Sequence, residues 1–405
     1  LAASLARGHS GARPEVVETL LAMLAARVHP VVPSIGSVGA SGDLAPLAHV
    51  ALALIGEGEA EDASGRIGPA AEALGAAGIS AVTLEAKEGL ALLNGTHLMA
   101  AMAALAVHDA EQLLRAALGS AAMALDACRG TDGPLDDRIH AVRGQRGQRA
   151  VAEVLRSMLD SSGILPAHRE DDPRVQDPYC LRCTPQVLGA VVDGLDHVRV
   201  IVERELGAVS DNPLVFPGEA DPATGEILSG GNFHGMPLAL VLDQLKPCLC
   251  HLAGIAERRV YWLLSARDPE NPVQAYLSPT PGLHSGLMIA QYTAAACCNE
   301  LQHLASPASV GNVPTSAGIE DYNSFGPAAG FQARRAIERA RSVIAIEYLV
   351  MAEGLESQRP LRSGVGVEWR HAVIREHVAP LTADRPPAPD IAAIETLIAE
   401  GRLSE

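Results

Sequence analysis

The amino-acid sequence predicts an all-α protein in which long helices pack side by side in a central bundle. Hydrophobic residues make up 48% of the 405 residues, which is enough to bury a large core. Ala and Leu, which are strong helix formers, recur along the whole chain, whereas aromatic residues make up only 3%. Long segments place apolar residues three and four positions apart, and strands and helices do not alternate along the chain.

Residues 1–86 are expected to form the remainder of an N-terminal region. Residues 14–26 predict a short helix, because Pro14 suits the first helical position and apolar residues follow at helical spacing. Residues 31–42 break this periodicity with Pro33 and three glycines, so they predict a small irregular region with a functional loop. The helical pattern resumes at residues 44–55.

Residues 87–405 are expected to form the central and C-terminal helical bundle. Long segments of helical periodicity predict helices at residues 184–206, 236–265, 284–305 and 331–352. Short strands are expected within residues 214–229. A proline-rich stretch at residues 385–389 predicts a linker before a last helix.

Charge and cysteine content exclude several classes of protein. The chain carries 31 Lys and Arg against 48 Asp and Glu, a net charge of −17, so neither nucleic acid nor an anionic membrane surface is an expected partner. No uninterrupted apolar run in the sequence is long enough to span a membrane; residues 50–55, for example, give only a short one. Seven scattered cysteines argue against a disulfide framework and favour a reducing compartment, hence a cytoplasmic protein.

The glycine-rich segment 36–49 is the most informative part of the sequence. Phosphate binding is one interpretation, because such loops before helices bind anions, but the spacing matches neither the Walker nor the dinucleotide-binding pattern. A plain turn, with Asp43 capping the next helix, is the second interpretation.

The third interpretation is chemical, because Ala40-Ser41-Gly42 can cyclise. The Gly nitrogen attacks the Ala carbonyl carbon, and the loss of two waters leaves a 4-methylidene-imidazol-5-one ring. Ala40 and Gly42 are small enough for the backbone to fold back on itself, and Ser41 supplies the carbon of the exocyclic methylene. The product is an electrophile, which none of the twenty side chains provides.

Segment 36–49 resembles the signature of the histidine/phenylalanine ammonia-lyase family, and its flanking residues most resemble the histidine-specific members. An isolated Ala-Ser-Gly would carry no such information, but the surrounding residues make the match specific. Further blocks resemble the family in the same order over nearly the whole chain: residues 7–11, 87–96, 175–183, 210–214, 230–235 and 307–310.

The resemblance implies elimination of ammonia from L-histidine to give trans-urocanate, with the ring of Ala40, Ser41 and Gly42 as a self-made prosthetic group. It implies no metal and no diffusible cofactor. It also implies a homotetramer with composite active sites. Two alternatives remain open: a phenylalanine or tyrosine ammonia-lyase or aminomutase with the same group, and a catalytically incomplete helical fragment.

Roles for individual side chains are also implied by the resemblance. The catalytic set is Ala40, Ser41, Gly42, Asn94, Tyr179 and Glu300, and the substrate-binding set is Gln176, Arg182, Asn212 and Phe233. Arg182 would bind the substrate carboxylate bidentately, which a planar guanidinium does better than Lys. Glu300 lies within an apolar helical segment, where a carboxylate seldom lacks a partner or a task. Each residue alone has an ordinary structural explanation, and only the ordered set favours the family.

A zinc site is a rival interpretation of the cysteines. Cys180 and Cys183 form a CxxC, and Cys248, Cys250 and His251 offer further ligands. The second group falls on a predicted helix, where positions two apart point to different sides. We therefore expect no metal.

Departures from the histidine-specific pattern leave the aromatic substrate open. They are His97, Met236 and the block 320–324, in which Tyr322 stands where those enzymes more often have His. The chain also begins with Leu1 rather than Met, within a helical pattern, which is typical either of a fragment or processed product or of a chain that lacks only its initiator Met. The resemblance places the tyrosine that removes the β-proton upstream of Leu1, which predicts slow turnover by this chain.

Overall fold

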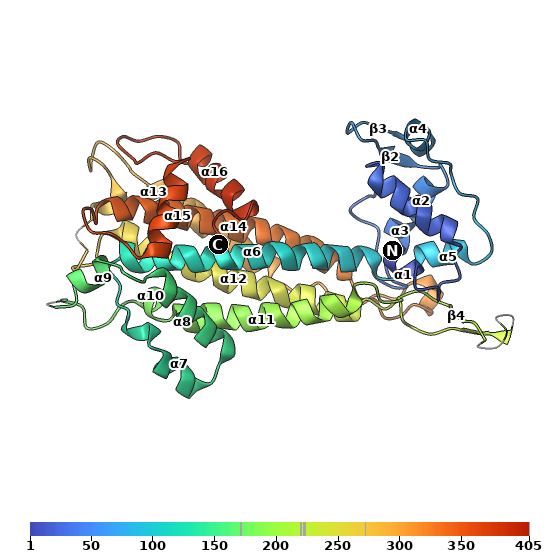
Figure 1. Cartoon of the computed structure of the whole chain (residues 1–405), viewed down its shortest axis with the longest axis horizontal. Coiled ribbons are helices and arrows are strands. Elements are labelled where there is room, and N and C mark those ends of the chain that lie inside the picture. Colours follow the sequence, from blue (N-terminus) through green and yellow to red (C-terminus); the bar gives the residue numbers. More distant parts are fainter. Residues whose placement is uncertain (171, 219–220, 222–223, 272, 405) are drawn as a thin grey trace. The chain divides into compact units, whose positions relative to one another are not determined.

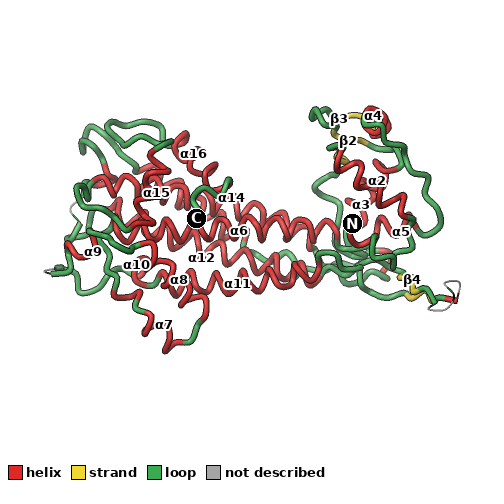
Figure 2. Tube along the Cα trace, in the orientation of Figure 1, coloured by secondary structure: helices red, strands yellow, loops and turns green. Residues whose placement is uncertain are grey.

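The computed structural model describes residues 1–170, 172–218, 221, 224–271 and 273–404. These residues are mostly helical, with α-helices α1 to α16 and only short strands (Figures 1 and 2). The predicted all-α class is confirmed. The chain divides into two compact units: unit 1 comprises residues 1–105, 199–243 and 307–331, and unit 2 comprises residues 106–198, 244–306 and 332–405. The domain boundary expected after residue 86 stays a prediction.

Unit 1 combines short helices with two small antiparallel sheets. Its helices are α1 (Ala2–Leu5), α2 (Pro14–Ala25), α3 (Leu44–Leu54), α4 (Ala70–Ala76) and α5 (Glu88–Leu93). Strands β1 (His29–Pro30), β2 (Glu59–Glu61) and β3 (Ile67–Pro69) pair in that order, and β4 (Leu214–Phe216) pairs with β5 (Glu226–Leu228). The strands expected within residues 214–229 are confirmed, whereas the sequence did not predict β1 to β3. Pro14 begins α2, as its missing N–H favours.

Four long helices form the bundle: α6 (His97–Ala127), α11 (Thr184–Glu205), α12 (Met236–Ser265) and α14 (Gly326–Glu356). Side-chain contacts in unit 2 show how they pack. Arg259 of α12 pairs with Glu347 of α14, and the Tyr348 hydroxyl donates a 2.7 Å hydrogen bond to the Ala116 carbonyl of α6. Helix α12 continues through Pro247.

Shorter helices complete unit 2: α7 (Asp137–Arg143), α8 (Arg146–Met158), α9 (Ile164–Ala167), α10 (Tyr179–Arg182), α13 (Met288–Leu304), α15 (Val365–Arg375) and α16 (Ala388–Ala399). Single-turn 3₁₀ segments lie at Gly133–Leu135 and Ala275–Leu277, and unit 1 has one at Ser316–Gly318. Of the described helices, α12 is the one long and apolar enough to cross a membrane. However, 56% of its most apolar window is buried inside the protein, as in a core helix.

Candidate functional site

The Ala40-Ser41-Gly42 loop lies immediately before α3 and is packed backbone to backbone. Gly39 and Gly42 adopt positive φ angles of 67° and 80°, the left-handed region that favours glycine. The Asp43 N–H donates a 2.8 Å hydrogen bond to the Gly95 carbonyl. A Cβ atom at Gly42 would overlap the Gly95 backbone, so only glycine fits at this position.

The N-terminal side of the loop is held by a different segment of unit 1. The Ser324 and Phe325 N–H groups donate to the Gly39 and Val38 carbonyls, at 3.1 and 3.0 Å. The Ser324 hydroxyl donates a second bond, of 3.1 Å, to the Gly39 carbonyl. Ala40 is buried. The tripeptide is therefore held in a compact turn in which position 42 has room only for glycine.

Ser41 has a carboxylate as its direct partner. Its hydroxyl donates a 2.8 Å hydrogen bond to Glu320 Oε1, and Glu320 Oε2 accepts a 3.1 Å bond from the Thr315 hydroxyl. The sequence had indicated the 320–324 block only as a departure that affects substrate choice. Glu320 is thus a candidate functional residue that sequence reasoning missed, although the acidic residues of this block were a usable signal.

Asp43 occupies the N-cap position of α3 but does not cap that helix with its side chain. Its Oδ2 instead accepts a 3.0 Å hydrogen bond from the Met99 N–H, at the start of α6. Burial raises the pKa of Asp43 to about 7, against the hydrogen bonds from Met99 and Leu98 that lower it. The plain-turn interpretation, in which Asp43 caps the next helix, is therefore wrong for its side chain.

Asn94 is brought next to the loop, as expected. It is buried at the end of α5, and the following Gly95 N–H donates a long, 3.5 Å bond to the Ser41 carbonyl. Its side-chain amide donates to the Leu90 carbonyl at 3.3 Å. The structure thus places the Asn94–Gly95 turn against the reactive tripeptide.

Asn212 and Phe233 lie elsewhere in unit 1. The Asn212 side chain accepts a 2.7 Å hydrogen bond from the Gly230 N–H and bonds the Ser229 hydroxyl, so it closes the base of the β4–β5 hairpin. Phe233 is half-buried. The next residue, His234, bonds the Tyr322 carbonyl at 3.0 Å, which links the Phe233 segment to the segment of Glu320.

Tyr179 and Arg182 are brought together in unit 2, on the short helix α10. The Arg182 guanidinium lies over the Tyr179 ring, 4.9 Å from its centroid, a cation–π contact. Tyr179 is 71% exposed, and Gln176 just before it is also exposed. These polar groups are therefore accessible in the described chain.

Glu300 of α13 forms two ion pairs with α14. Its carboxylate contacts Arg335, and its Oε2 lies 3.0 Å from Arg339 Nε. The expectation that this carboxylate has a partner is met by two arginines. Its role near the reacting amine stays a prediction, and Glu320 is the carboxylate that contacts Ser41.

The cysteines do not form a metal site among the described residues. No group of three or more His, Cys, Asp or Glu side chains there converges as metal ligands would. Burial raises the pKa of the Cys180 thiol to about 11 and raises that of Cys248 as well, which disfavours the thiolates that zinc binds.

Comparison with known proteins gives consistent matches. A family model described as aromatic amino acid lyase matches residues 1–376. The histidine ammonia-lyase of Sorangium cellulosum is 47% identical over 399 residues, which cover 98% of this chain and 77% of the relative. That of Deinococcus radiodurans is 48% identical over 402 residues, with 99% and 75% covered. The chain thus spans about three quarters of these relatives.

Solved structures agree in fold. The crystal structure of histidine ammonia-lyase from Trypanosoma cruzi superimposes with a TM-score of 0.90 at 36% identity, over 99% of this chain and 74% of the other. A tyrosine aminomutase from Streptomyces globisporus gives the same TM-score at 34% identity, over 99% and 78%.

Proposed function

Since the chain belongs to the aromatic amino acid lyase family, we propose that it eliminates ammonia from L-histidine to give trans-urocanate. The observation that carries this proposal is the fold-back of Ala40-Ser41-Gly42 against Gly95, which a Cβ atom at Gly42 would prevent. The relatives named histidine ammonia-lyase, at 47–48% identity over nearly the whole chain, support histidine as the substrate.

We further propose that Ala40, Ser41 and Gly42 form a 4-methylidene-imidazol-5-one group. Two observations support its fit: the left-handed φ of Gly42 and the hydrogen bond from the Ser41 hydroxyl to Glu320. Cyclisation requires Ser41 to lose this hydroxyl as water, and Glu320 is the side chain in direct contact with it that can exchange a proton with the hydroxyl. Once formed, the group supplies an electrophilic carbon that raises the reactivity of the bound amino acid. No metal or diffusible cofactor is proposed.

Four side chains are proposed to bind and orient the substrate. Arg182 binds its carboxylate through two parallel hydrogen bonds, and Gln176 and Asn212 each provide an amide for the polar groups of the substrate. Phe233 packs beside the ring. Binding the substrate in a fixed orientation reduces the entropic cost of aligning the two bonds that break in the elimination, the Cα–N bond and the Cβ–H bond.

Two hydrogen-bonding groups and one proton acceptor are proposed to act on the substrate amine and its surroundings. Asn94 hydrogen-bonds the substrate amine, and Tyr179 acts as a hydrogen-bonding catalytic residue. Glu320 accepts the proton that the substrate ammonium must lose before its nitrogen can react. This assignment favours Glu320 over Glu300, because two arginines already hold the Glu300 carboxylate.

A second candidate is a tyrosine or phenylalanine lyase or aminomutase. The tyrosine aminomutase of the same fold and the presence of Tyr322 favour it. Incubation with L-histidine, L-tyrosine and L-phenylalanine, followed by chromatography, separates these functions by product: urocanate, a hydroxycinnamate or cinnamate, or a β-amino acid.

Ser41→Ala tests the proposed chemistry. Ala has no hydroxyl to lose, so we expect no urocanate from L-histidine and loss of the near-ultraviolet absorbance that distinguishes the ring from peptide. Far-ultraviolet circular dichroism should stay at the parent level. Ser64→Ala, in an exposed turn, is the matched control and should keep full activity. Turnover by Ser41→Ala within a few-fold of the parent would overturn the proposal.

We also propose a cytoplasmic homotetramer with composite active sites. Long apolar helices and the family resemblance support an assembly, and closed point-group symmetry is the usual form of such homo-oligomers. Multi-angle light scattering should give four times the mass of one chain. A stable, fully active monomer would contradict it.

A further inference from the structure

Residues 172–183, here called the 172–183 segment, carry Gln176, Tyr179 and Arg182. Helix α10 within it has only four residues and no side-chain cap, and so short a helix has little stability of its own. Apolar burial does not fix its outer face, because Val175 is 97% exposed and Tyr179 is 71% exposed. Cys180 and Leu181 are buried and fix the C-terminal part of the segment, but residues 172–179 bury no apolar side chain, so another interaction must hold that part in place.

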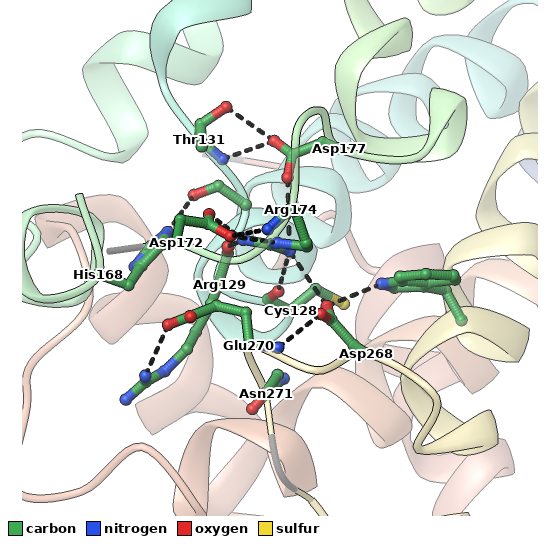
Figure 3. Close-up of polar contacts among 12 residues, drawn as sticks. Cys128, Arg129, Thr131, His168, Asp172, Arg174, Asp177, Asp268, Glu270 and Asn271 are labelled. Atoms are coloured by element: carbon green, nitrogen blue, oxygen red, sulfur yellow. Dashed lines mark hydrogen bonds and ion pairs between the residues drawn. The ribbon is translucent and has the colours of Figure 1, made fainter. Parts of the chain in front are cut away.

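Arg174 provides that interaction, because its side chain is only 6% exposed and lies among three carboxylates (Figure 3). Its guanidinium nitrogens lie 2.9 Å from Asp172, 3.4 Å from Asp177 and 3.0 Å from Asp268. The hydrogen bond from Arg174 is the largest cause that lowers the pKa of Asp172. One buried guanidinium thus compensates several buried charges.

The same guanidinium also reaches the end of α6. It donates to the carbonyl oxygens of Cys128, at 3.4 Å, and Arg129. The last carbonyls of a helix lack intrahelical partners and carry a partial negative charge. Arg174 therefore ties the 172–183 segment to a rigid helix of the bundle.

Asp177 makes a second connection to the same place. Its Oδ2 accepts hydrogen bonds from the Thr131 N–H, at 2.7 Å, and from the Thr131 hydroxyl, at 2.8 Å. The side chain is 1% exposed. Asp177 directly follows Gln176 and lies two residues before Tyr179, so any shift of Asp177 moves both.

Asp268 anchors the cluster from the end of α12. It accepts a 3.2 Å hydrogen bond from the Trp262 indole and a 3.0 Å bond from the Glu270 N–H (Figure 3). At the other end of the segment, the Thr184 hydroxyl and Arg259 both donate to the Cys180 carbonyl, at 2.9 and 3.4 Å. The segment is held by buried polar groups at both ends, while its exposed face stays free for substrate.

We propose that Arg174 and Asp177 are positioning residues, which hold Gln176, Tyr179 and Arg182 in the geometry that substrate binding requires. This inference rests on the proposed function for the roles of those three residues. Neither Arg174 nor Asp177 is proposed to touch the substrate.

Three variants of the full chain test the proposal: Arg174→Gln, Asp177→Asn and the charge-conserving Arg174→Lys. Arg169→Gln is the matched control, because Arg169 pairs with Asp132 at 3.1 Å. Arg169 lies just before the 172–183 segment, and Asp132 directly follows Thr131. Unlike the Arg174 cluster, this ion pair is exposed: its side chains are 63% and 50% exposed. Amide hydrogen exchange over residues 172–183, kcat and KM for L-histidine, and near-ultraviolet absorbance are measured below the unfolding temperature of each variant.

In Arg174→Gln and Asp177→Asn, the backbone amide hydrogens of the 172–183 segment should exchange faster than in the parent. The amide hydrogens of α6 and α12 should exchange as slowly as in the parent. A displaced binding group typically costs about 10²-fold in kcat/KM, and the KM for L-histidine should rise more than kcat falls, because Arg182 binds the substrate carboxylate. The ring absorbance should not change. Arg174→Lys should recover part of the loss, and Arg169→Gln should match the parent.

Parent-like exchange in the segment, or parent-like KM and kcat, in Arg174→Gln would overturn the inference. Uniformly faster exchange in all helices would also overturn it, because the role would then be general stability. If Arg174→Gln does not fold, hydrogen exchange and the kcat and KM of Arg174→Lys and Asp177→Asn test the inference instead. A parent chain that makes no urocanate would instead overturn the proposed function.

Discussion

Two segments that the proposed reaction requires are held in place by different physical means. The loop of residues 36–43 in unit 1 is shaped by backbone: Gly42 packs against Gly95, and residues 324–325 bond the carbonyls on its N-terminal side. The 172–183 segment of unit 2 is held by charge: Arg174 sits among three acidic side chains and two helix-terminal carbonyls.

The difference teaches what each segment tolerates. The backbone packing at Gly42 leaves no room for one added carbon atom. It does not depend on side-chain charge, because its contacts are between peptide groups. A buried charge cluster tolerates small changes of shape, but it is strongly disturbed when one charge is removed. We therefore expect a larger side chain to disturb the loop of residues 36–43 and the loss of a charge to disturb the 172–183 segment.

Gly42→Ala should have the largest effect. The added Cβ would overlap the Gly95 backbone at a left-handed φ, so the tripeptide cannot keep the fold-back that ring formation requires. We expect no ring absorbance and no measurable urocanate. Gly36→Ala is the matched control, since its Cβ would meet only Ala45 at 3.6 Å, an ordinary contact. A fully active Gly42→Ala would show that the close approach is not required.

The pair Glu320→Gln and Glu300→Gln compares the two candidate carboxylates. Loss of a general acid or base typically costs about 10²–10⁴-fold, and we expect a fall in kcat of this size for Glu320→Gln. Glu300→Gln should stay near parent activity. It should lose at most about 1 kcal/mol of stability, because its arginine partners are partly exposed. The opposite result in steady-state assays would return the catalytic role to Glu300.

Sequence reasoning succeeded where the signal was periodic or contained in a local motif. The helices of the bundle follow from apolar spacing, and the Ala40–Gly42 loop was found because segment 36–49 as a whole resembles a family signature. Glu320 was missed because its importance comes from a hydrogen bond across 279 positions of the chain. Arg174 was missed although Asp172 and Asp177 are close to it in sequence, because nothing local distinguishes a buried arginine from an exposed one and its third partner, Asp268, is remote. Strands β1 to β3 are two or three residues long, too short for a period-two pattern.

Arg182→Gln should have an intermediate effect. It removes the proposed bidentate partner of the substrate carboxylate, and hydrogen bonds to charged groups contribute about 1.5–3 kcal/mol. KM for L-histidine should therefore rise by about 10- to 150-fold, with a smaller change in kcat. Arg182→Lys should recover only part of the affinity, because an ammonium lacks the planar fork. An unchanged KM in initial-rate measurements would exclude Arg182 from carboxylate binding.

The smallest effect concerns Asp43, where the backbone-held loop contains one buried charge. Burial raises its pKa to about 7 from an ordinary value of 3.8, so between these pH values the folded chain binds more protons than the unfolded chain. The free energy of unfolding should fall as pH rises from about 4 to about 7, and this contribution should be constant above that. Asp43→Asn cannot ionise, yet its amide oxygen can still accept the bond from the Met99 N–H. Its melting temperature should therefore exceed that of the parent by a margin that grows from pH 5 to pH 8, equivalent to on the order of a few kcal/mol. Asp126 of unit 2, whose pKa burial raises to about 6, is present in both proteins and cancels from the comparison. A constant difference in melting temperature across this range would show that Asp43 ionises as freely as an exposed aspartate.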